Sequence, residues 1–408
     1  MRVSEVRQAE PMSTPNRKLQ RVVPPQRSAS LPTLAGRPRN CIVSVISPCR
    51  NEAAYIGPFL ESVLAQRLPA GVSLEVLIAD GQSDDGTRES IDEYARAHPC
   101  IEVLDNPRRI VSTGLNAAIR RSRGDVIVRM DVHTHYAPDY ITECLRSLDR
   151  TGADNVGGPW VPQGSGYVSE AIALAFSSPF VSGGGKAHRA AYEGPVDTVY
   201  LGCWPRKTFE KFGLFDEDFV RTQDSELNLR IHRGGGTIWQ TPAVRSWYTP
   251  RPSLPQLARQ YTQYGYWKAR VIKKHKLPAS LRQLAPGGFL AGLLLFALLA
   301  PFVSWARPAL ASLVLAYVAA VGAGSLLACA APSHWKYLPV MPLVISVYHF
   351  GFGYGFWRGL IDFLVLQKDA NQNLSALTRV SASPLRRSSS ESNETIARRR
   401  AAGEGGAA

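Results

Sequence analysis

The sequence predicts an α/β fold with a doubly wound, mostly parallel sheet in the first part of the chain. Three observations support this fold class. Short runs rich in β-branched residues recur along residues 41–150 and have the length of buried strands. Segments with apolar residues at helical spacing separate these runs, so strands and helices alternate. Polar clusters follow the strands directly, where ligands bind in sheets of this kind.

The predicted elements follow one another in a regular order. Residues 42–47 form the first strand, and the next helix places several apolar residues on one face, namely Ile56, Phe59, Leu60, Val63 and Leu64. Residues 74–79 form the second strand, and a helix begins near Thr87. The later elements are a strand at 101–104, a helix through Leu115 and Ile119, a strand at 126–130 and a helix that Pro138 opens.

Changes in composition divide the chain into five segments. These are a disordered basic segment at 1–40, the α/β domain at 41–250, an amphipathic membrane-interface helix at 251–283, a transmembrane or re-entrant anchor at 284–367 and a disordered basic tail at 368–408. Of the net charge of +14, the two ends carry +6 and +3. No basic–aromatic groove motif accompanies this charge, so we expect no nucleic-acid partner. Basic ends beside a membrane instead attract anionic membrane lipids.

Two apolar segments, 284–304 and 309–331, contain no charged residue and are long enough to cross a bilayer as helices. The four residues between them predict a tight hairpin. A third apolar stretch at 338–357 contains three glycines, and it either spans, re-enters or lies on the surface. The positive-inside rule favours an even number of spans in the inner membrane, with the α/β domain in the cytoplasm. The N-terminus lacks the apolar run of a cleavable signal peptide.

The segment 253–275 combines an apolar and aromatic stripe at helical spacing with basic flanks. A helix with this pattern lies in the headgroup region or packs on the α/β domain, and the sequence leaves both alternatives open. The six cysteines include no CxxC pair, which predicts reduced and mostly buried thiols.

Two polar motifs follow the first two predicted strands. The stretch from Pro48 through Arg50 to Glu52 places polar groups where a nucleotide binds, although an ordinary charged surface turn has a similar composition. Asp80 opens the second motif and can accept hydrogen bonds from a base edge. Asp85 or Thr87 can cap the next helix, so a capped turn without a ligand is the alternative.

Asp131 and His133 follow the strand at 126–130 and predict a metal site. Residues two apart in an extended chain point to the same side, so these two can share one divalent cation. A cation at such a site can neutralise the negative charge of a diphosphate group. A carboxylate with an imidazole favours Mn²⁺ over the harder Mg²⁺. His135 continues the alternation, but a surface position is the preferred interpretation for it.

These motifs together resemble the family 2 glycosyltransferases, which have a GT-A fold and invert the anomeric carbon. The matching stretches span about residues 41–245 in the family's order, and they are 43–52, 80–87, 114–116, 124–125, 131–133, 202–206, 212–217 and 223–230. The pairing of this domain with Asp131-Val132-His133 and apolar C-terminal segments resembles, more narrowly, the succinoglycan-type exopolysaccharide glucosyltransferases.

The resemblance implies roles for the site residues. Pro48, Arg50, Glu52 and Asp80 would bind the nucleotide part of a nucleotide-sugar donor. Asp131 and His133 would hold the ribose and the metal diphosphate. Asp224 would be the general base, with Glu226 as its rival. Two positions depart from the family pattern, because His133 replaces the usual second aspartate and Gln223 replaces the usual acidic residue before the base.

The glycine-rich loop at 183–189 contains Lys186 and Arg189, and it is either a lid that closes over the donor phosphates or a flexible linker. Trp204 and Trp239 can stack on a sugar, although packing in the core is the preferred interpretation for both.

The resemblance implies transfer of a hexose, from UDP-glucose or UDP-galactose, to a lipid-linked saccharide in exopolysaccharide or cell-surface glycan synthesis. An alternative enzyme is a polyprenyl-phosphate sugar transferase, whose phosphate acceptor needs no strong base. An alternative from another class is a membrane scaffold with a nucleotide-binding pseudoenzyme domain.

Overall fold

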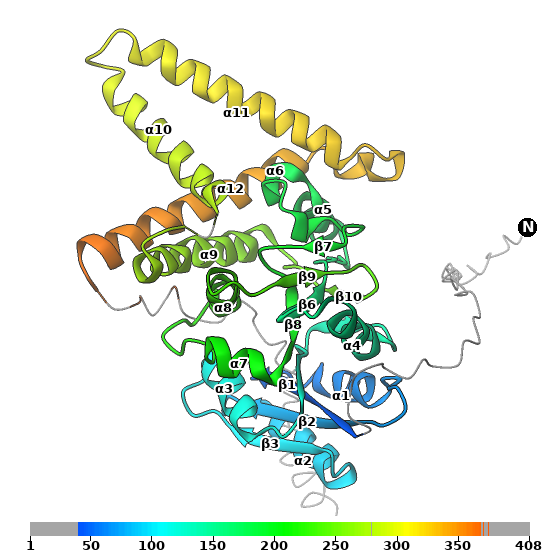
Figure 1. Cartoon of the computed structure of the whole chain (residues 1–408). Coiled ribbons are helices and arrows are strands. Elements are labelled where there is room, and N and C mark those ends of the chain that lie inside the picture. Colours follow the sequence, from blue (N-terminus) through cyan, green and yellow to red (C-terminus); the bar gives the residue numbers. More distant parts are fainter. Residues whose placement is uncertain (1–39, 279, 369, 371–373, 375–408) are drawn as a thin grey trace, which may run out of the picture.

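The computed structural model describes residues 40–278, 280–368, 370 and 374. Helices α9 (Leu254–His275) and α12 (Met341–Leu360) lie beside the α/β domain (Figure 1). Helices α10 (Ala285–Leu299) and α11 (Ala306–Ala328) form a hairpin that projects beyond them. The two basic ends predicted to be disordered lie outside the described residues, apart from a few positions at their borders.

The central sheet has eight strands in the order β3-β2-β1-β4-β8-β6-β9-β7. Their bounds are β1 Cys41–Cys49, β2 Val72–Asp80, β3 Ile101–Asp105, β4 Val126–Arg129, β6 Asn155–Gly158, β7 Gly194–Pro195, β8 Tyr200–Pro205 and β9 Ile238–Gln240. Strands β5 (Thr134–Tyr136) and β10 (Ser246–Tyr248) form a separate antiparallel pair.

The sheet is mixed but mostly parallel, as predicted, because four of its seven strand pairings are parallel, including that of β6 with β9. Strands β3, β2, β1 and β4 are parallel, and these are the four strands that the sequence pattern predicts. Strand β8 lies antiparallel to both of its neighbours, β4 and β6. It joins the sheet after a long helical excursion and runs in the opposite direction, which the strand–helix alternation of the first half does not signal.

Helices cover both faces of the sheet, which confirms the doubly wound α/β class. One core cluster joins alternate strand residues such as Val45 and Val128 to α1 (Ile56–Leu64), α2 (Thr87–Ala97) and α4 (Tyr140–Thr151). The opposite cluster joins residues such as Ile46 and Ile127 to α3 (Val111–Arg121), α7 (Arg206–Phe212) and α8 (Gln223–Arg233). The helices between β6 and β7 are α5 (Tyr167–Ser177) and α6 (Pro179–Ser182).

None of the six cysteines, all of which the structure describes, forms a disulfide, and every one except the half-buried Cys100 is buried. Trp204 lies in the core beside Phe209 and Phe215, at ring-centroid distances of 5.4 and 6.0 Å, so it packs rather than faces a ligand. Both outcomes agree with the sequence predictions.

Helix α9 packs closely against α12, and glycines make this approach possible. A Cβ atom at Gly355 of α12 would lie 1.9 Å from the carbonyl oxygen of Thr262, and one at Gly265 of α9 would lie 2.0 Å from that of Phe352. The aromatic residues Tyr266 and Trp267 of α9 are fully buried. The helix predicted at 253–275 is therefore packed against α12, and its place at the membrane interface stays a prediction.

Replacing Gly355 by Ala is expected to destabilise the protein by about 1–3 kcal/mol, because the added methyl group forces the two helix backbones apart. Gly288 of α10 is a matched control, since a Cβ atom there meets no other atom within 4 Å. Thermal unfolding in detergent checks both variants. An unchanged melting temperature for Gly355→Ala would show that the two helices do not depend on this close approach.

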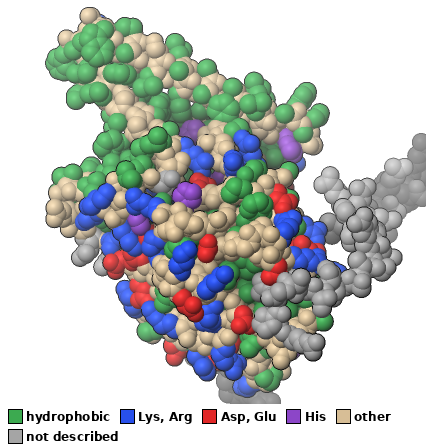
Figure 2. Space-filling model, viewed as in Figure 1, with side chains coloured by type: hydrophobic (Ala, Val, Ile, Leu, Met, Phe, Trp, Pro, Cys, Tyr) green, Lys and Arg blue, Asp and Glu red, His purple; other side chains and the backbone are tan. Residues whose placement is uncertain are grey.

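The hairpin of α10 and α11 is exposed and apolar. Leu281–Leu299 and Ala306–Ala328 are long and apolar enough to cross a membrane, and only 6% and 17% of their spanning windows are buried. The core helix of a soluble protein would be buried. Figure 2 shows hydrophobic side chains covering this projection, whereas charged side chains gather over the α/β domain.

The third apolar stretch forms α12, which lies along α9 instead of extending with the hairpin (Figure 1). A short π-helical turn, Ile361–Val365, ends it.

Candidate active site

A cavity of about 1010 Å³ lies between the α/β domain and the helices that follow it. One end is lined by the loop after β1 and by residues after β4. The other end is lined by Phe289 of α10, Tyr317 of α11 and Phe352 of α12. Asp224, near the start of α8, lies along the same cavity. The cavity therefore connects the ends of the central strands with the apolar hairpin.

Hydrogen bonds join the loop after β1 to the loop after β2. The Asn51 amide N–H donates to the Ser83 hydroxyl at 2.9 Å, and its side-chain amide donates to Asp84 at 2.8 Å. The Glu52 N–H donates to the Thr87 hydroxyl at 2.7 Å. These bonds hold the two polar motifs together at one edge of the sheet. This arrangement is expected, because both motifs follow neighbouring parallel strands.

Three of the four residues predicted to bind the nucleotide, Pro48, Arg50 and Glu52, line the cavity. Asp80 lies behind them. It is 2% exposed, and its carboxylate accepts hydrogen bonds from the Ser83 hydroxyl at 2.6 Å and from the Ser83 N–H at 3.2 Å. These bonds stabilise the turn after β2, and a contact between Asp80 and a base stays a prediction.

Arg129 is a buried cation between two predicted site residues. It lies in β4 with 6% exposure, and it donates two hydrogen bonds of 2.8 Å to the carboxylate of Asp131. Its third nitrogen lies 3.9 Å from Asp224. Burial by itself lowers the pKa of Arg129, but Asp131 and Asp224 raise it above the ordinary value. Arg129 therefore remains charged and fixes the spacing of the two carboxylates.

The sequence analysis missed Arg129, although one signal was present. A charged residue inside an otherwise apolar buried strand, such as the run at 126–130, requires a partner, and carboxylates further along the chain are the natural candidates.

His133 lies in a turn, so the argument from an extended chain was wrong in its geometry. The chain leaves β4 at Arg129, and residues 132–133 form the turn before β5. The Nε2 atom of His133 lies 2.5 Å from a carboxylate oxygen of Glu52. The other ring nitrogen, Nδ1, is buried and has no hydrogen-bond partner among the described residues. With the proton on Nε2, Nδ1 presents a free lone pair.

His135 lies exposed on β5 and does not line the cavity, as preferred from the sequence.

Asp224 is held at the start of α8 by an unusual turn. Thr222, which precedes the helix, has a φ of 61°, in the left-handed region that non-glycine residues rarely adopt. Asn51, Arg109 and Leu201 also have positive φ, and all four residues line the cavity. Strained backbone of this kind concentrates at functional sites, where the surrounding structure enforces it. The side chain of Asp224 is 31% exposed, so a ligand can reach it.

Glu226 is excluded as the rival base by its surroundings. It is fully buried, and its carboxylate accepts hydrogen bonds from Arg230 at 2.9 Å and from Lys274 at 2.7 Å, with His275 Nε2 at 2.9 Å. Burial raises the pKa of Glu226, but the bonds from Arg230 and Lys274 lower it below the ordinary value. This carboxylate ties α8 to the C-terminal end of α9.

Replacing Glu226 by Gln is expected to destabilise the protein by on the order of 3 kcal/mol, because the cations around it lose their buried counter-charge. Asp218→Asn is a control, since its side chain is 71% exposed and its ion pair with Arg270, at 3.4 Å, contributes less than about 1 kcal/mol. Chemical denaturation of both variants gives the comparison. Equal stability of the two variants would contradict the structural role of Glu226.

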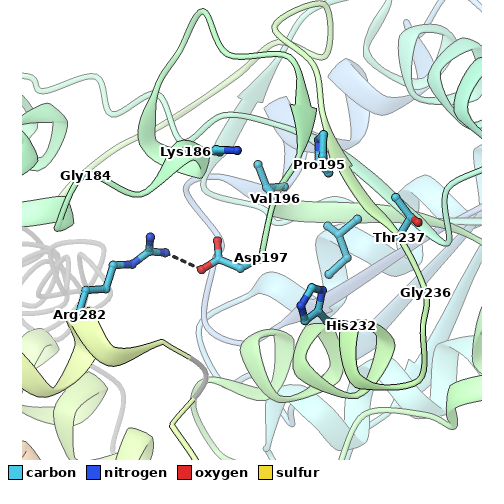
Figure 3. Close-up of a pocket in the computed structure, with 10 residues that line it drawn as sticks. Gly184, Lys186, Pro195, Val196, Asp197, His232, Gly236, Thr237 and Arg282 are labelled. Atoms are coloured by element: carbon cyan, nitrogen blue, oxygen red, sulfur yellow. Dashed lines mark hydrogen bonds and ion pairs between the residues drawn. The ribbon is translucent and has the colours of Figure 1, made fainter.

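The glycine-rich loop at 183–189 borders a second cavity of about 520 Å³ (Figure 3). Lys186 lines this second cavity, whereas Asp197 and Arg282, which form an ion pair, line both cavities. His188 stacks on Trp160 with a ring-centroid distance of 5.3 Å, and burial lowers the pKa of His188 to about 4. The loop is thus anchored by the stacking of the neutral His188 ring on Trp160. A closing motion of the loop stays a prediction.

Comparisons with known proteins agree with this architecture. Residues 44–204 match the model of glycosyl transferase family 2. The chain is 31% identical over 321 residues to the succinoglycan biosynthesis protein ExoA of Rhizobium meliloti, a match that covers 78% of this chain and 95% of that protein. It is 27% identical over 328 residues to the dolichyl N-acetyl-α-D-glucosaminyl phosphate 3-β-D-2,3-diacetamido-2,3-dideoxy-β-D-glucuronosyltransferase of Methanococcus voltae, covering 78% and 97%.

Among solved structures, the mannosyltransferase PcManGT of Pyrobaculum calidifontis, in complex with GDP-Man and Mn²⁺, has a TM-score of 0.53 at 22% identity. This match covers 80% of the present chain and 89% of the other, and it supports the fold. The fold and the comparisons together define a glycosyltransferase with a GT-A-type α/β domain. The chain belongs to glycosyl transferase family 2.

Proposed function

We propose that this chain is a membrane-anchored, inverting hexosyltransferase of exopolysaccharide or cell-surface glycan synthesis. It transfers a hexose from a UDP-sugar to a lipid-linked saccharide at the cytoplasmic face of the inner membrane. The observation that carries the proposal is the cavity that extends from the strand ends, past Asp224, to the exposed apolar hairpin. A donor bound by the strand-end loops and a lipid-linked acceptor bound beside the hairpin would then meet at the carboxylate of Asp224.

Asp224 is the proposed general base. It accepts the proton of the acceptor hydroxyl while that oxygen bonds to the anomeric carbon and the bond to the diphosphate breaks on the opposite side. Its exposure of 31% and its place in the lining of the cavity support this role. Pro48, Arg50 and Glu52 are proposed to contact the nucleotide, with Asp80 supporting their edge.

Asp131 and His133 are the proposed metal ligands, and the donor atoms fit. The unpaired, buried Nδ1 of His133 has a lone pair available while Glu52 accepts from Nε2, the arrangement usual for a metal-binding histidine. The described residues contain no group of three or more His, Cys, Asp or Glu that could hold a metal by themselves. The substrate diphosphate would complete the coordination, as is common for Mg²⁺ and Mn²⁺. A bound cation would neutralise charge on the departing diphosphate.

The relatives support the choice of acceptor. The R. meliloti protein is named for succinoglycan biosynthesis, and the name of the M. voltae enzyme places its acceptor on a dolichyl phosphate. Both proteins align over nearly their whole length with this chain, including its apolar C-terminal part. A lipid-linked saccharide also explains why the site opens toward the hairpin.

The test offers membranes containing the protein a panel of radiolabelled nucleotide sugars together with extracted lipid-linked saccharides. We expect label from a UDP-hexose to enter the lipid fraction with inversion of the anomeric carbon. Transfer to water-soluble acceptors alone, or from no UDP-sugar, would contradict the proposal. Linkage analysis of the product identifies the acceptor hydroxyl.

A further inference from the structure

Lys268 of α9 lies in the main cavity without a counter-ion. No described residue forms an ion pair or hydrogen bond with its ammonium group, although Asp224 and Asp197 act on it electrostatically over a longer distance. Arg282, the remaining charged group that acts on Lys268, is itself paired with Asp197. A desolvated ammonium group with no close partner is unfavourable unless a ligand supplies the negative charge.

Charged groups of both signs surround Lys268 in the cavity. Arg129 contacts both Asp131 and Asp224, and Lys268 feels Asp224 on one hand and the ion pair of Asp197 with Arg282 on the other. Arg282 belongs to the short turn Leu281–Leu284, which leads directly into α10. Asp224 and Arg282 act on Lys268 electrostatically and Asp131 does not, so Lys268 lies closer to Asp224 and to the turn before α10 than to Asp131.

Helix α9 presents one continuous face to the cavity. Gln256, Gln260, Tyr264 and Lys268 recur at every fourth residue, and all four line the cavity. At 1.5 Å per residue, this row is about 18 Å long. Near it, the apolar wall includes Phe289 and Tyr317, whose rings stack at a centroid distance of 4.4 Å. A polar row beside an apolar wall suits a molecule with a hydrocarbon tail and a polar head.

We propose that Lys268 binds the phosphate of the lipid-linked acceptor, so that the saccharide attached to this phosphate extends toward Asp224. The proposal rests on the proposed function, since it assigns the acceptor end of the same cavity. The donor diphosphate is the other phosphate that could reach the cavity. We assign it to the strand-end loops and Asp131, because Asp131 is not among the groups that act on Lys268 electrostatically.

The pKa of Lys268 agrees with this placement. Burial lowers it to about 8, and Asp224 raises it only in part. At neutral pH the group is still mainly protonated and therefore attracts an anion.

A binding experiment on the full chain in detergent tests the site without catalysis. The donor site is saturated with UDP and Mn²⁺, and the probes are farnesyl diphosphate and its neutral counterpart farnesol. Calorimetry is performed on the wild-type protein, on Lys268→Met and Lys268→Arg, and on Lys273→Met. Lys273 lies on the same helix but does not line the cavity, which makes it the matched control.

We expect the wild type to bind farnesyl diphosphate at least about tenfold more tightly than farnesol, because the diphosphate adds a charge-assisted hydrogen bond. Lys268→Met should lose this preference, whereas Lys268→Arg and Lys273→Met should keep it. Binding of farnesyl diphosphate only when UDP is left out would overturn the proposal in favour of the donor site. Equal loss of farnesol binding in Lys268→Met would show a structural role instead.

The two proposals can fail separately. Selective diphosphate binding without any transfer to lipid-linked saccharides would leave the Lys268 site standing and reject the proposed reaction. Transfer to such saccharides with an unchanged acceptor KM in Lys268→Met would reject the Lys268 site alone.

Discussion

Asp224→Asn is expected to lower turnover by about 10²–10⁴-fold, because general-base catalysis typically contributes a factor of this size. The substitution preserves the size and shape of the side chain but removes the proton acceptor. UDP binding should hardly change, since Asp224 lies beyond Arg129 from Asp131. The measurements are turnover with a lipid-linked acceptor and UDP affinity by calorimetry.

Asp131→Asn is the matched comparison for this experiment. It removes the carboxylate on the donor side of Arg129, so metal and UDP binding should weaken first. Near-normal turnover of Asp224→Asn, or a loss of UDP binding as large as that of Asp131→Asn, would reject Asp224 as the base. A polyprenyl-phosphate acceptor, which needs no base, would then be the better interpretation.

Removal of divalent metal is expected to abolish transfer, and Mn²⁺ should restore it better than Mg²⁺ because one ligand is an imidazole. His133→Asp makes the protein ligands all oxygen and should shift the preference toward Mg²⁺. Glu52→Gln should weaken Mn²⁺ binding by about 10–100-fold, because it removes the carboxylate that orients His133. Electron paramagnetic resonance of bound Mn²⁺ gives a readout that does not depend on turnover. Full activity in excess chelator would remove the metal role of Asp131 and His133.

The strands of the parallel half and the two polar loops could be predicted because their signals are local. The β-branched runs near Val45 and Leu77 carry the strand pattern in consecutive residues, and the polar residues after them must meet at one edge. The pairing of Glu52 with His133 could not be predicted in this way. It depends on a turn at 132–133 that interrupts the alternation expected of a strand.

The acceptor side of the site depends on contacts between distant segments. Lys268 lies more than forty residues after Asp224 in the sequence, and α9 reaches the cavity only because Glu226 and the glycines of α12 hold it there. Nothing in the amphipathic pattern of 253–275 distinguishes a helix buried in this way from one lying on lipid. Prediction from the sequence is limited in the same way for Arg129. A buried arginine in a strand indicates that a counter-charge is present, but the sequence does not identify Asp131 and Asp224 as its partners.

The close packing of α9 against α12 fixes the distance between Asp224 and the apolar hairpin. One end of α9 is bonded to the helix that carries Asp224, while its length is seated on the helix beside the anchor. With the hairpin in a bilayer, the proposed general base would stand at a constant height above the lipid surface. An acceptor hydroxyl meets it only when the saccharide has the right reach. We therefore expect the proposed transferase to use acceptors of one length and to add a single sugar to each.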